Sequence, residues 1–382
     1  MTKRHAVLLM VAIAASTLSA AVLDVRAFGA KADGKVKDTA AIQAAIDAAA
    51  KAGGAVEFPA GTYLSGTIYL KSGVELRLAE NAVLKGSPDR ADYCAADAFP
   101  QNAASKGDNT SGGHLLVAAG CTNVTVRGPG RIDGNSPAFL VDPATGKQYP
   151  GGKLKIPWRP AQMLFFVDCR NVLLDGVEIA DSPYWSCFIL NCDVVTVRNC
   201  NVHTERNKFC TWNGDGIDID RSSNVYVTGC TIVTYDDSIT LRASSAKRLA
   251  APQDCHNVVV SDCRLTSACT GVRIGVGEGV VRDCQLSRLK ITNTRVGVSL
   301  YSSYTPQSRG TDIHDIRFTD VDVDCRKFLD VTYGYAKEAV IRDIVFHNVR
   351  GRAKERNAIH EKPGLKYENI SLIDCSVEGA QE

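Results

Sequence analysis

The stretch "CRNVLLDGVEI", Cys169–Ile179, sets a pattern that recurs along most of the chain. Its aliphatic residues alternate with polar ones, and an Asp-Gly pair interrupts the run, as expected for two short strands separated by a turn. Variants of this stretch occur in four other places, one before it and three after it: "CTNVTVRGPGRI" (121–132), "CDVVTVRNCNV" (192–202), "SNVYVTGCTI" (223–232) and "CHNVVVSDCRL" (255–265). The chain is therefore expected to repeat one strand-turn-strand unit.

The copies are spaced by about 20 to a little over 30 residues. Repeats of this length are typical of solenoids, in which each unit packs only on its neighbours. Amphipathic helical patterns do not separate the strands, which disfavours a βαβ arrangement. The sequence predicts an all-β fold, a right-handed parallel β-helix in which each repeat forms one coil.

One helix is expected near the N-terminus, in "DTAAIQAAIDAAAKAGG". Asp38 or Thr39 is the expected N-cap, and Gly53–Gly54 ends the pattern. An apolar stripe follows one face: Ile42, Ala45, Ile46 and Ala49. Because an open solenoid end exposes its core and unpaired strand edges, this helix is expected to cap that end. No shift in composition marks a linker, so residues 22–382 are predicted to form a single domain.

The first residues have the order of a secretory signal peptide, with a cationic start ("MTKRH"), an apolar run ("AVLLMVAIAA") and small residues ("STLSAA"). The apolar run is shorter than the roughly 20 residues that span a bilayer. We therefore expect residues 1–21 to be a cleaved leader. The mature protein is expected to be secreted, extracellular or periplasmic, with no membrane insertion.

Charge argues against a nucleic-acid partner. The formal net charge is +2, and loss of Lys3 and Arg4 with the leader would bring it to zero. A neutral chain without a basic block has no electrostatic footprint for nucleic acid. We expect a monomer whose partner is a polysaccharide or oligosaccharide substrate.

The fourteen cysteines recur at fixed places in the repeat. Five end one strand phrase (Cys200, Cys230, Cys263, Cys284 and Cys375), and four begin another (Cys121, Cys169, Cys192 and Cys255). Free cysteine behaves as a small buried hydrophobe, so this recurrence predicts stacked interior columns, with one or two disulfides left open. The cysteines lack C-x-x-C spacing and no histidine cluster occurs, so neither a metal site nor a cofactor is expected.

Two acidic stretches, "NGDGIDI" (213–219) and "YDDSITL" (235–241), suggest chemistry. Asp215 and Asp236 are about one coil apart in sequence, and hydrogen-bonded strands lie about 4.8 Å apart. Asp236 and the adjacent Asp237 face one groove only if the chain turns there, because strand neighbours point to opposite sides. Carboxylates brought together repel, so one stays protonated beside an ionised one, as glycoside hydrolysis requires. The alternative is ordinary turn chemistry.

"NGDGIDI" and "YDDSITLR" resemble the N-T-D-G-x-D and G-D-D-C-I-x-x-K signatures of glycoside hydrolase family 28, which includes polygalacturonases and rhamnogalacturonan hydrolases. "VTVRGPGRIDGN" and "DSPYWSCFILNCDVVTVRNC" are similar to segments that precede the active site of that family. The similarity runs from about Val25 to the C-terminus. It implies a pectin-lyase-like solenoid and an inverting hydrolase without a covalent intermediate.

The resemblance also implies roles. Asp236 matches the general acid, and Asp215 and Asp237 match the pair that holds and deprotonates the attacking water. Asp218 matches the second Asp of the first signature, where it supports the strand or contacts substrate. Asn213 matches the residue that orders this turn and is a candidate for substrate contact.

Two departures from the family pattern affect substrate recognition. Where polygalacturonases carry G-H-G-x-S-I-G, this chain has "CTGVRIG", which puts Thr270 at the histidine and Arg273 at the serine. Where they carry R-I-K, "GVSLY" leaves Ser299 and Tyr301. In the family those cations bind a galacturonate carboxylate beside the cleavage point. The expected substrate is therefore not plain polygalacturonan but rhamnogalacturonan, a substituted pectin or a terminal residue.

The replacement substrate-binding groups are predicted as candidates. Arg242 stands at the family's Lys position and Arg273 one coil further on. Either would bind an anionic sugar, or would be a solvated surface arginine. Thr270 and Tyr301 take the places of lost family residues, and Tyr301 would stack on a sugar ring or donate a hydrogen bond.

Two other candidates flank the acidic stretches. Glu278, in "GVGEG", would line the groove, although a Glu between glycines is typical of a turn. Trp212 stands in a loop before Asp215 and would offer a sugar platform, whereas Trp185 is expected to pack.

Two other function classes stay open. A pectate-lyase-type enzyme shares the β-helix and would use Ca²⁺, whose oxygen ligands three Asp would supply. Its product would carry a new C=C bond, and chelator would stop its activity. A non-catalytic carbohydrate-binding β-helix would bind glycan without turnover.

Overall fold

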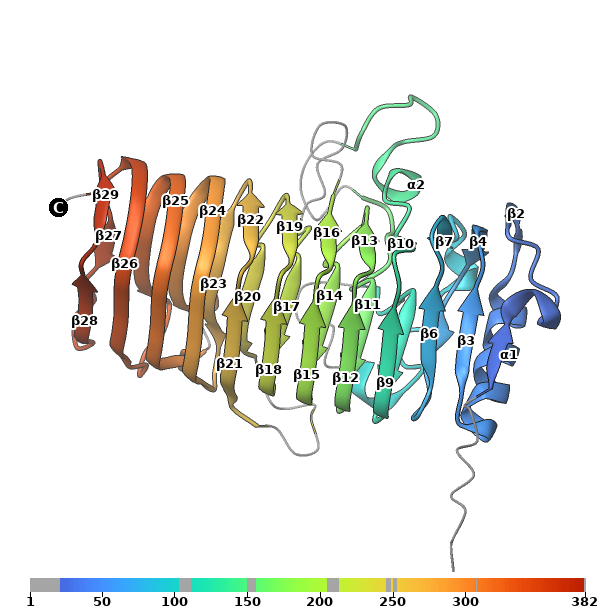
Figure 1. Cartoon of the computed structure of the whole chain (residues 1–382). Coiled ribbons are helices and arrows are strands. Elements are labelled where there is room, and N and C mark those ends of the chain that lie inside the picture. The colour runs from blue at the N-terminus through green and yellow to red at the C-terminus, as the bar shows by residue number, and fades with distance from the viewer. Residues whose placement is uncertain are drawn as a thin grey trace, which may run out of the picture.

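The computed structural model describes residues 21–102, 111–149, 156–204, 213–244, 249, 253–306 and 308–380. Within them the chain forms one long stack of parallel strands, and the first and last coils lie at opposite ends of the stack (Figure 1). The predicted all-β, right-handed parallel β-helix is confirmed. The expected leader, residues 1–21, falls almost wholly outside the described residues.

The strand pairings form three ladders, one along each side of the coil, and every pairing between the named strands is parallel. The first ladder consists of β1 (Val22–Asp24), β3 (Ala55–Phe58), β6 (Glu75–Leu78), β9 (Thr122–Arg127), β12 (Arg170–Asp175), β15 (Asp193–Arg198), β18 (Ser223–Thr228), β21 (Cys255–Ser261) and β28 (Tyr367–Ile373). The second consists of β2 (Asp33–Lys37), β4 (Gly61–Ser65), β7 (Ala82–Gly86), β10 (Arg131–Asp133), β13 (Glu178–Ala180), β16 (Asn201–His203), β19 (Thr231–Thr234), β22 (Arg264–Ser267) and β29 (Ser376–Glu378).

The third ladder carries the site described below. It consists of β5 (Ile68–Tyr69), β8 (Leu116–Ala119), β11 (Leu164–Val167), β14 (Cys187–Leu190), β17 (Ile217–Asp220), β20 (Ile239–Ala243), β23 (Thr270–Gly277) and β27 (Ala358–His360). Three long strands run through more than one ladder: β24 (Val280–Ser303), β25 (Asp312–Gly334) and β26 (Ile341–Glu355).

The asparagine of the repeated phrase marks a tight corner of the coil. Asn123, Asn171, Asn224 and Asn257 have φ between 53° and 57°, in the left-handed region. Asparagine tolerates this conformation better than most residues because its short polar side chain bonds locally. The Asn171 amide donates to Asn123 Oδ1 at 2.7 Å, so successive corners are also hydrogen-bonded to one another. The recurrence of Asn thus follows from backbone geometry.

The cysteines of the repeat line the interior. Every described cysteine is free, and most are buried. Cys121, Cys169 and Cys192 lie one above another on successive coils, and the Cys169 N–H donates to Cys192 Sγ at 3.4 Å. The prediction of stacked interior columns is confirmed for these cysteines.

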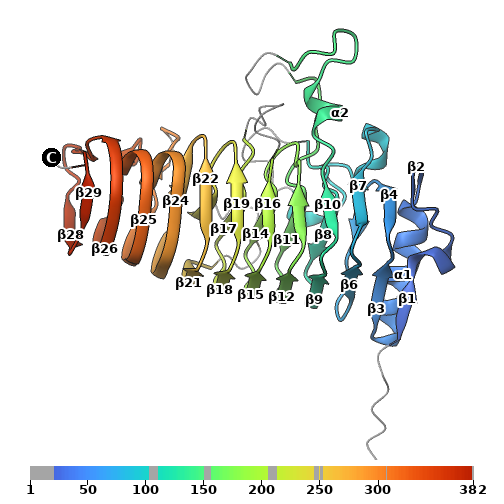
Figure 2. The same ribbon diagram turned by 45° about the horizontal axis from the view of Figure 1, so that its top comes forward.

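The N-terminal helix is confirmed as α1 (Thr39–Ala52), at the first end of the stack (Figure 2). Its predicted apolar stripe is fully buried: Ile42, Ala45, Ile46 and Ala49. Asp38 is the N-cap residue, but its carboxylate instead accepts from the N–H groups of Lys31 and Ala32 and ties down the preceding loop. Gly53 ends the helix in the left-handed conformation.

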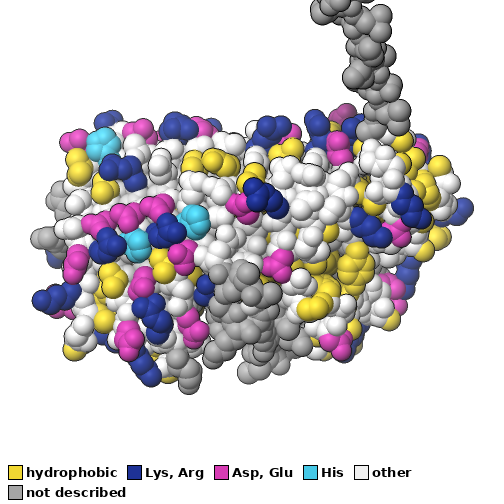
Figure 3. Space-filling view, turned by 90° about the horizontal axis from the view of Figure 1, so that it is seen from below, with side chains coloured by type: hydrophobic (Ala, Val, Ile, Leu, Met, Phe, Trp, Pro, Cys, Tyr) yellow, Lys and Arg dark blue, Asp and Glu magenta, His cyan; other side chains and the backbone are white. Residues whose placement is uncertain are grey.

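The other helical segments are short: η1 (Val25–Phe28), η2 (Arg90–Asp92) and α2 (Pro137–Leu140). None of the helices in the described part of the chain is long and apolar enough to cross a membrane. On the face shown in Figure 3, basic and acidic side chains are interspersed, with no basic block.

Candidate active site

A bend between β19 and β20 brings both residues of the Asp-Asp pair to one side. β19 ends at Thr234, and the chain bends at Tyr235 and Asp236 before β20 begins. The Thr234 hydroxyl donates to the Asp236 carbonyl at 2.8 Å and fixes this bend. Asp236 and Asp237 consequently line the same pocket, of about 360 Å³. The turn that the sequence reasoning required is present.

The neighbouring coil adds the third carboxylate. Ile217 pairs with Ile239, and the Gly216 N–H donates to the Asp237 carbonyl at 2.9 Å, so Asp215 stands one coil from Asp237. A Cβ on Gly216 would lie 2.4 Å from the Ser238 carbonyl oxygen. Glycine is thus required beside Asp215 because two backbones approach closely there.

Six of the residues singled out from the sequence line this pocket: Asn213, Asp215, Asp236, Asp237, Arg242 and Arg273. Six further residues complete it: Trp185, Thr240, Cys269, Val276, Arg295 and Tyr304. The lining thus combines three carboxylates and three guanidinium groups with two aromatic rings. Such a mixture suits a polar, charged ligand.

Two of the three carboxylates are held toward their protonated forms. Burial raises the pKa of Asp215 well above its ordinary value, and the nearby Asp218, Asp236 and Asp237 raise it further. The pKa of Asp236 is raised by burial and then by the charge of Asp237. Asp215 Oδ1 is buried and has no hydrogen-bond partner among the described residues.

Asp237 is held differently, by a buried arginine. Arg273 Nη2 donates to Asp237 Oδ1 at 2.9 Å, and its Nε donates to Oδ2. Both side chains are more than nine-tenths buried. Burial lowers the Arg273 pKa, but the charge and hydrogen bonds of Asp237 outweigh this and raise it well above the ordinary value. The bidentate pair fixes both oxygens of Asp237 against a cation, directly beside Asp236.

Arg242, on β20, also lines the pocket. Its guanidinium stacks over the Trp185 ring, 4.6 Å from the centroid. It also lies 3.8 Å from the carboxylates of Asp218 and Asp220, which are buried beneath it. Asn213 is positioned by Arg159, whose Nη2 donates to Asn213 Oδ1 at 3.2 Å.

Asp218 is fully buried below the pocket and does not line it. Burial raises its pKa from 3.8 to about 8, and Arg242 only partly offsets this. Between these two pKa values the folded protein holds a proton on Asp218 that the unfolded chain releases. The free energy of unfolding therefore falls as pH rises from 3.8 to about 8. We predict that Asp218→Asn becomes progressively more stable than the parent across that range. Melting temperatures of the parent and the variant, measured at the two ends of this pH range, test the prediction. A difference between the two proteins that does not change with pH would contradict it.

The remaining candidates lie around the pocket without lining it. Thr270 is buried, and its Oγ1 accepts from Arg273 Nη2 at 2.9 Å. The ring of Tyr301 packs on that of Tyr304, with centroids 4.1 Å apart. Glu278 lies in the turn after β23, where its N–H donates to the Ala243 carbonyl. Trp212 lies outside the described residues.

Sequence reasoning missed six lining residues: Trp185, Thr240, Cys269, Val276, Arg295 and Tyr304. Trp185 was expected only to pack. It does so, at 5% exposed, but it also borders the pocket, because the Ser186 N–H donates to the Asp215 carbonyl one coil on. The register between adjacent coils is the signal that could have identified Trp185 and Arg295. Val296 pairs with Thr270, so the preceding residue, Arg295, lies beside Cys269.

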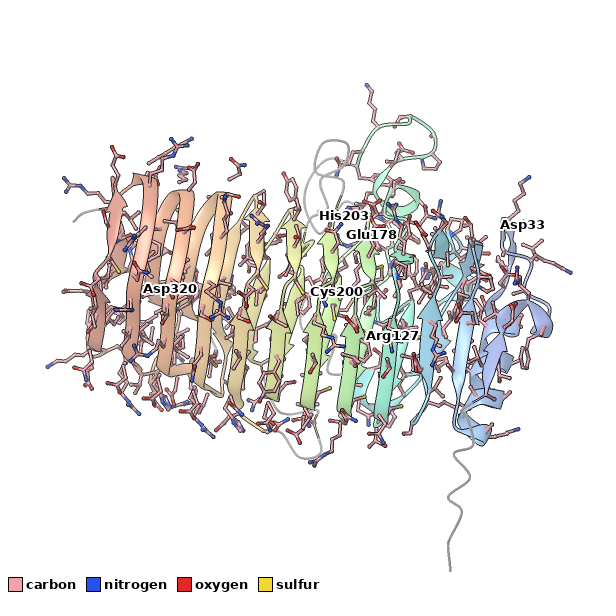
Figure 4. The ribbon with its side chains drawn as sticks, viewed as in Figure 1. Asp33, Arg127, Glu178, Cys200, His203 and Asp320 are labelled. Atoms are coloured by element: carbon pink, nitrogen blue, oxygen red, sulfur yellow. The ribbon has the colours of Figure 1, made fainter. Side chains whose placement is uncertain are left out.

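Three side chains that could bind a metal ion lie close together in this pocket. Among the described residues, Asp236, Asp237 and Cys269 each offer one ligand atom, all within 4.8 Å of one another. Two arginines adjoin this group, since Arg273 pairs with Asp237 and Arg295 contacts Cys269. The histidine His203 lies elsewhere: it points toward Glu178 on the second ladder, at 2.6 Å (Figure 4).

Sequence comparison assigns the family. Residues 55–382 match the model of glycosyl hydrolases family 28. The chain belongs to this family. An exo-poly-α-D-galacturonosidase of Dickeya chrysanthemi is 25% identical over 326 residues, which cover 74% of this chain and 52% of that protein. The chain spans about half the length of the first curated relatives that it matches, with 55%, 52% and 46% of their lengths covered.

Solved structures agree on the fold of this family 28 chain. An exopolygalacturonase of Thermotoga maritima superposes with a TM-score of 0.77 at 22% identity, covering 94% of this chain and 87% of that one. An endo-xylogalacturonan hydrolase of Aspergillus tubingensis gives a TM-score of 0.67 at 18% identity, with 95% of both chains covered.

Proposed function

We propose that this protein is an inverting glycoside hydrolase that cleaves a pectic or related acidic polysaccharide. The proposal is carried by one observation: three carboxylates from two adjacent coils line one pocket, and the two adjacent ones have different surroundings. Burial and the charge of Asp237 raise the pKa of Asp236, whereas Asp237 forms a bidentate ion pair with the buried Arg273. A carboxyl biased toward its acid form beside one that is paired with a cation is the arrangement that general acid and base roles require.

In this mechanism Asp236 donates its proton to the glycosidic oxygen as the bond from that oxygen to the anomeric carbon breaks. Water attacks the anomeric carbon from the opposite face and inverts its configuration. Asp237 accepts the water's proton, and Asp215, which lines the same pocket, helps to hold that water. Asp236 ends deprotonated and Asp237 protonated, and exchange with solvent restores both.

The substrate is proposed to be an acidic pectic chain other than plain polygalacturonan. Thr270, Ser299 and Tyr301 stand where polygalacturonases of the family carry a histidine and two cations. The pocket still holds three arginines, which favours a charged sugar. Relatives named for exo-poly-α-D-galacturonosidase and endo-xylogalacturonan hydrolase activity support a terminal galacturonate or a substituted galacturonan as candidates.

The purified protein should be tested on polygalacturonan, rhamnogalacturonan and xylogalacturonan, with product configuration followed by proton NMR. We expect cleavage of at least one substrate, an inverted anomeric product without a new C=C bond, and full activity in chelator. An unsaturated product and loss of activity in chelator would indicate the lyase alternative. Glycan binding without turnover would indicate the non-catalytic alternative.

We also infer that residues 22–382 act as one domain that is exported to the extracellular space or periplasm, as a monomer. The basis is the leader-like order of residues 1–21 and the neutral remainder of the chain. Cell fractionation of the full-length chain, with N-terminal sequencing of the exported form, tests the export. Light scattering tests the monomer.

A further inference from the structure

Arg295 differs from the other arginines of the pocket. It lies on β24, where the Val296 N–H donates to the Cys269 carbonyl at 2.9 Å, so Arg295 and Cys269 are neighbours on adjacent coils. Arg295 Nη2 donates to Cys269 Sγ at 2.9 Å, and both residues line the pocket. The rest of the Arg295 side chain is exposed.

The three arginines also differ in how their charges are balanced. Arg273 is neutralised by its bidentate pair with Asp237. Arg242 lies 3.8 Å from two buried carboxylates. Arg295 makes no ion pair with any carboxylate among the described residues, and its contact there is the sulfur of Cys269. It is the cation of this pocket whose charge the described residues leave uncompensated.

Cys269 orients this charge without cancelling it. Burial and the charges of Asp237 and Asp236 raise the pKa of the Cys269 thiol to about 11. Near neutrality the sulfur is therefore a neutral thiol that accepts hydrogen bonds from Arg295 at 2.9 Å and from Arg273 at 3.6 Å. A neutral acceptor holds the guanidinium at the lining of the pocket without cancelling its charge.

We propose that Arg295, oriented by Cys269, binds the carboxylate of a uronate unit beside the acid cluster and makes the pocket select ionised over esterified sugars. A guanidinium matches a carboxylate through two parallel hydrogen bonds, whereas a methyl ester offers no charge. The inference rests on the proposed glycan substrate, but it concerns recognition and not bond cleavage. Cys269 is a positioning residue in this scheme.

The test measures binding without turnover. Every protein in the test carries Asp236→Asn. Calorimetry measures the affinity for oligogalacturonate and for its methyl ester, first with Arg295 intact and then in the variants Arg295→Gln and Arg295→Lys. Arg295→Gln is expected to weaken binding of the free acid by about ten- to hundredfold, the effect of losing hydrogen bonds to a charged group. Binding of the ester should be unchanged. Arg295→Lys should retain part of the preference for the free acid over the ester. Cys269→Ser should retain more of that preference than Cys269→Ala does.

Arg317→Gln is the matched control, because Arg317 is exposed on β25, outside the pocket, and should leave both affinities unchanged. In the otherwise unchanged enzyme, Arg295→Gln should raise KM on the charged substrate with little change in kcat. Equal weakening of acid and ester, or a loss confined to kcat, would overturn the proposal. If no glycan is turned over but the acid-ester difference still depends on Arg295, the hydrolase proposal fails and this one stands.

Discussion

Replacement of Asp236 by Asn is expected to lower kcat by about 10²- to 10⁴-fold, the usual contribution of a positioned general acid. The amide has nearly the same shape but no acidic proton to give to the leaving oxygen. Because Asn carries no charge, the buried site is not destabilised, and glycan binding should persist. Reducing-end release on the substrate found in the screen, with binding measured in parallel, checks both expectations.

The pH dependence gives an independent check on the same residue. Asp236 is active as the protonated form, so kcat should fall as pH rises through its folded-state pKa, which burial and Asp237 place above the ordinary value. Asp262→Asn is the control: this exposed carboxylate pairs with Arg288 away from the pocket, and its loss should leave rate and profile unchanged. Near-parental turnover of Asp236→Asn would show that another group is the acid.

Replacement of Arg273 by Gln is expected to cost about 3–5 kcal/mol of the free energy of unfolding, the usual result of removing one partner of a buried ion pair. Asp237 would be left buried without its cation, and the two hydrogen bonds that fix its oxygens would be lost. Activity should fall together with stability, because Asp237 would no longer be held in place beside Asp236.

The chain offers a matched control for this prediction. Arg288 and Asp262 form a bidentate pair between coils, with both hydrogen bonds at 2.7 Å, but both side chains are about half exposed. Arg288→Gln should cost about 0–1 kcal/mol, as exposed pairs do. Urea unfolding of both variants makes the comparison. The double variant Arg273→Gln with Asp237→Asn should recover stability but not activity, and equal losses for the two single variants would contradict the argument.

The repeat was readable from sequence because backbone geometry imposes it. A left-handed corner recurs in every coil, and Asn171 or Asn224 satisfies it at little cost. The stripe of the capping helix was equally readable, since its period follows from helix geometry. The meeting of Asp215 with the Asp-Asp pair was predictable for the same reason: one coil separates them.

The other six lining residues were not singled out from the sequence, because successive coils differ in length. Ile217 pairs with Ile239, but Ile239 pairs with Val272, so the second coil is much longer than the first. A spacing learned from one coil therefore misplaces residues of the next, and Arg295 was passed over. The pairing of Arg273 with Asp237 was missed as well, because a side chain on one coil reaches back to the previous one.

The bend between β19 and β20 also matters for how such a pocket can diversify. The paired aspartates stand in a corner that hydrogen bonds from neighbouring coils brace, whereas Arg295 and Cys269 stand on coils further along. The proposed cleavage residues and the proposed carboxylate-binding Arg295 thus lie on different coils of one scaffold. The coil that carries Arg295 can change to suit another glycan while the coils that carry the aspartates stay as they are. Grafting coils between relatives is the corresponding route for engineering.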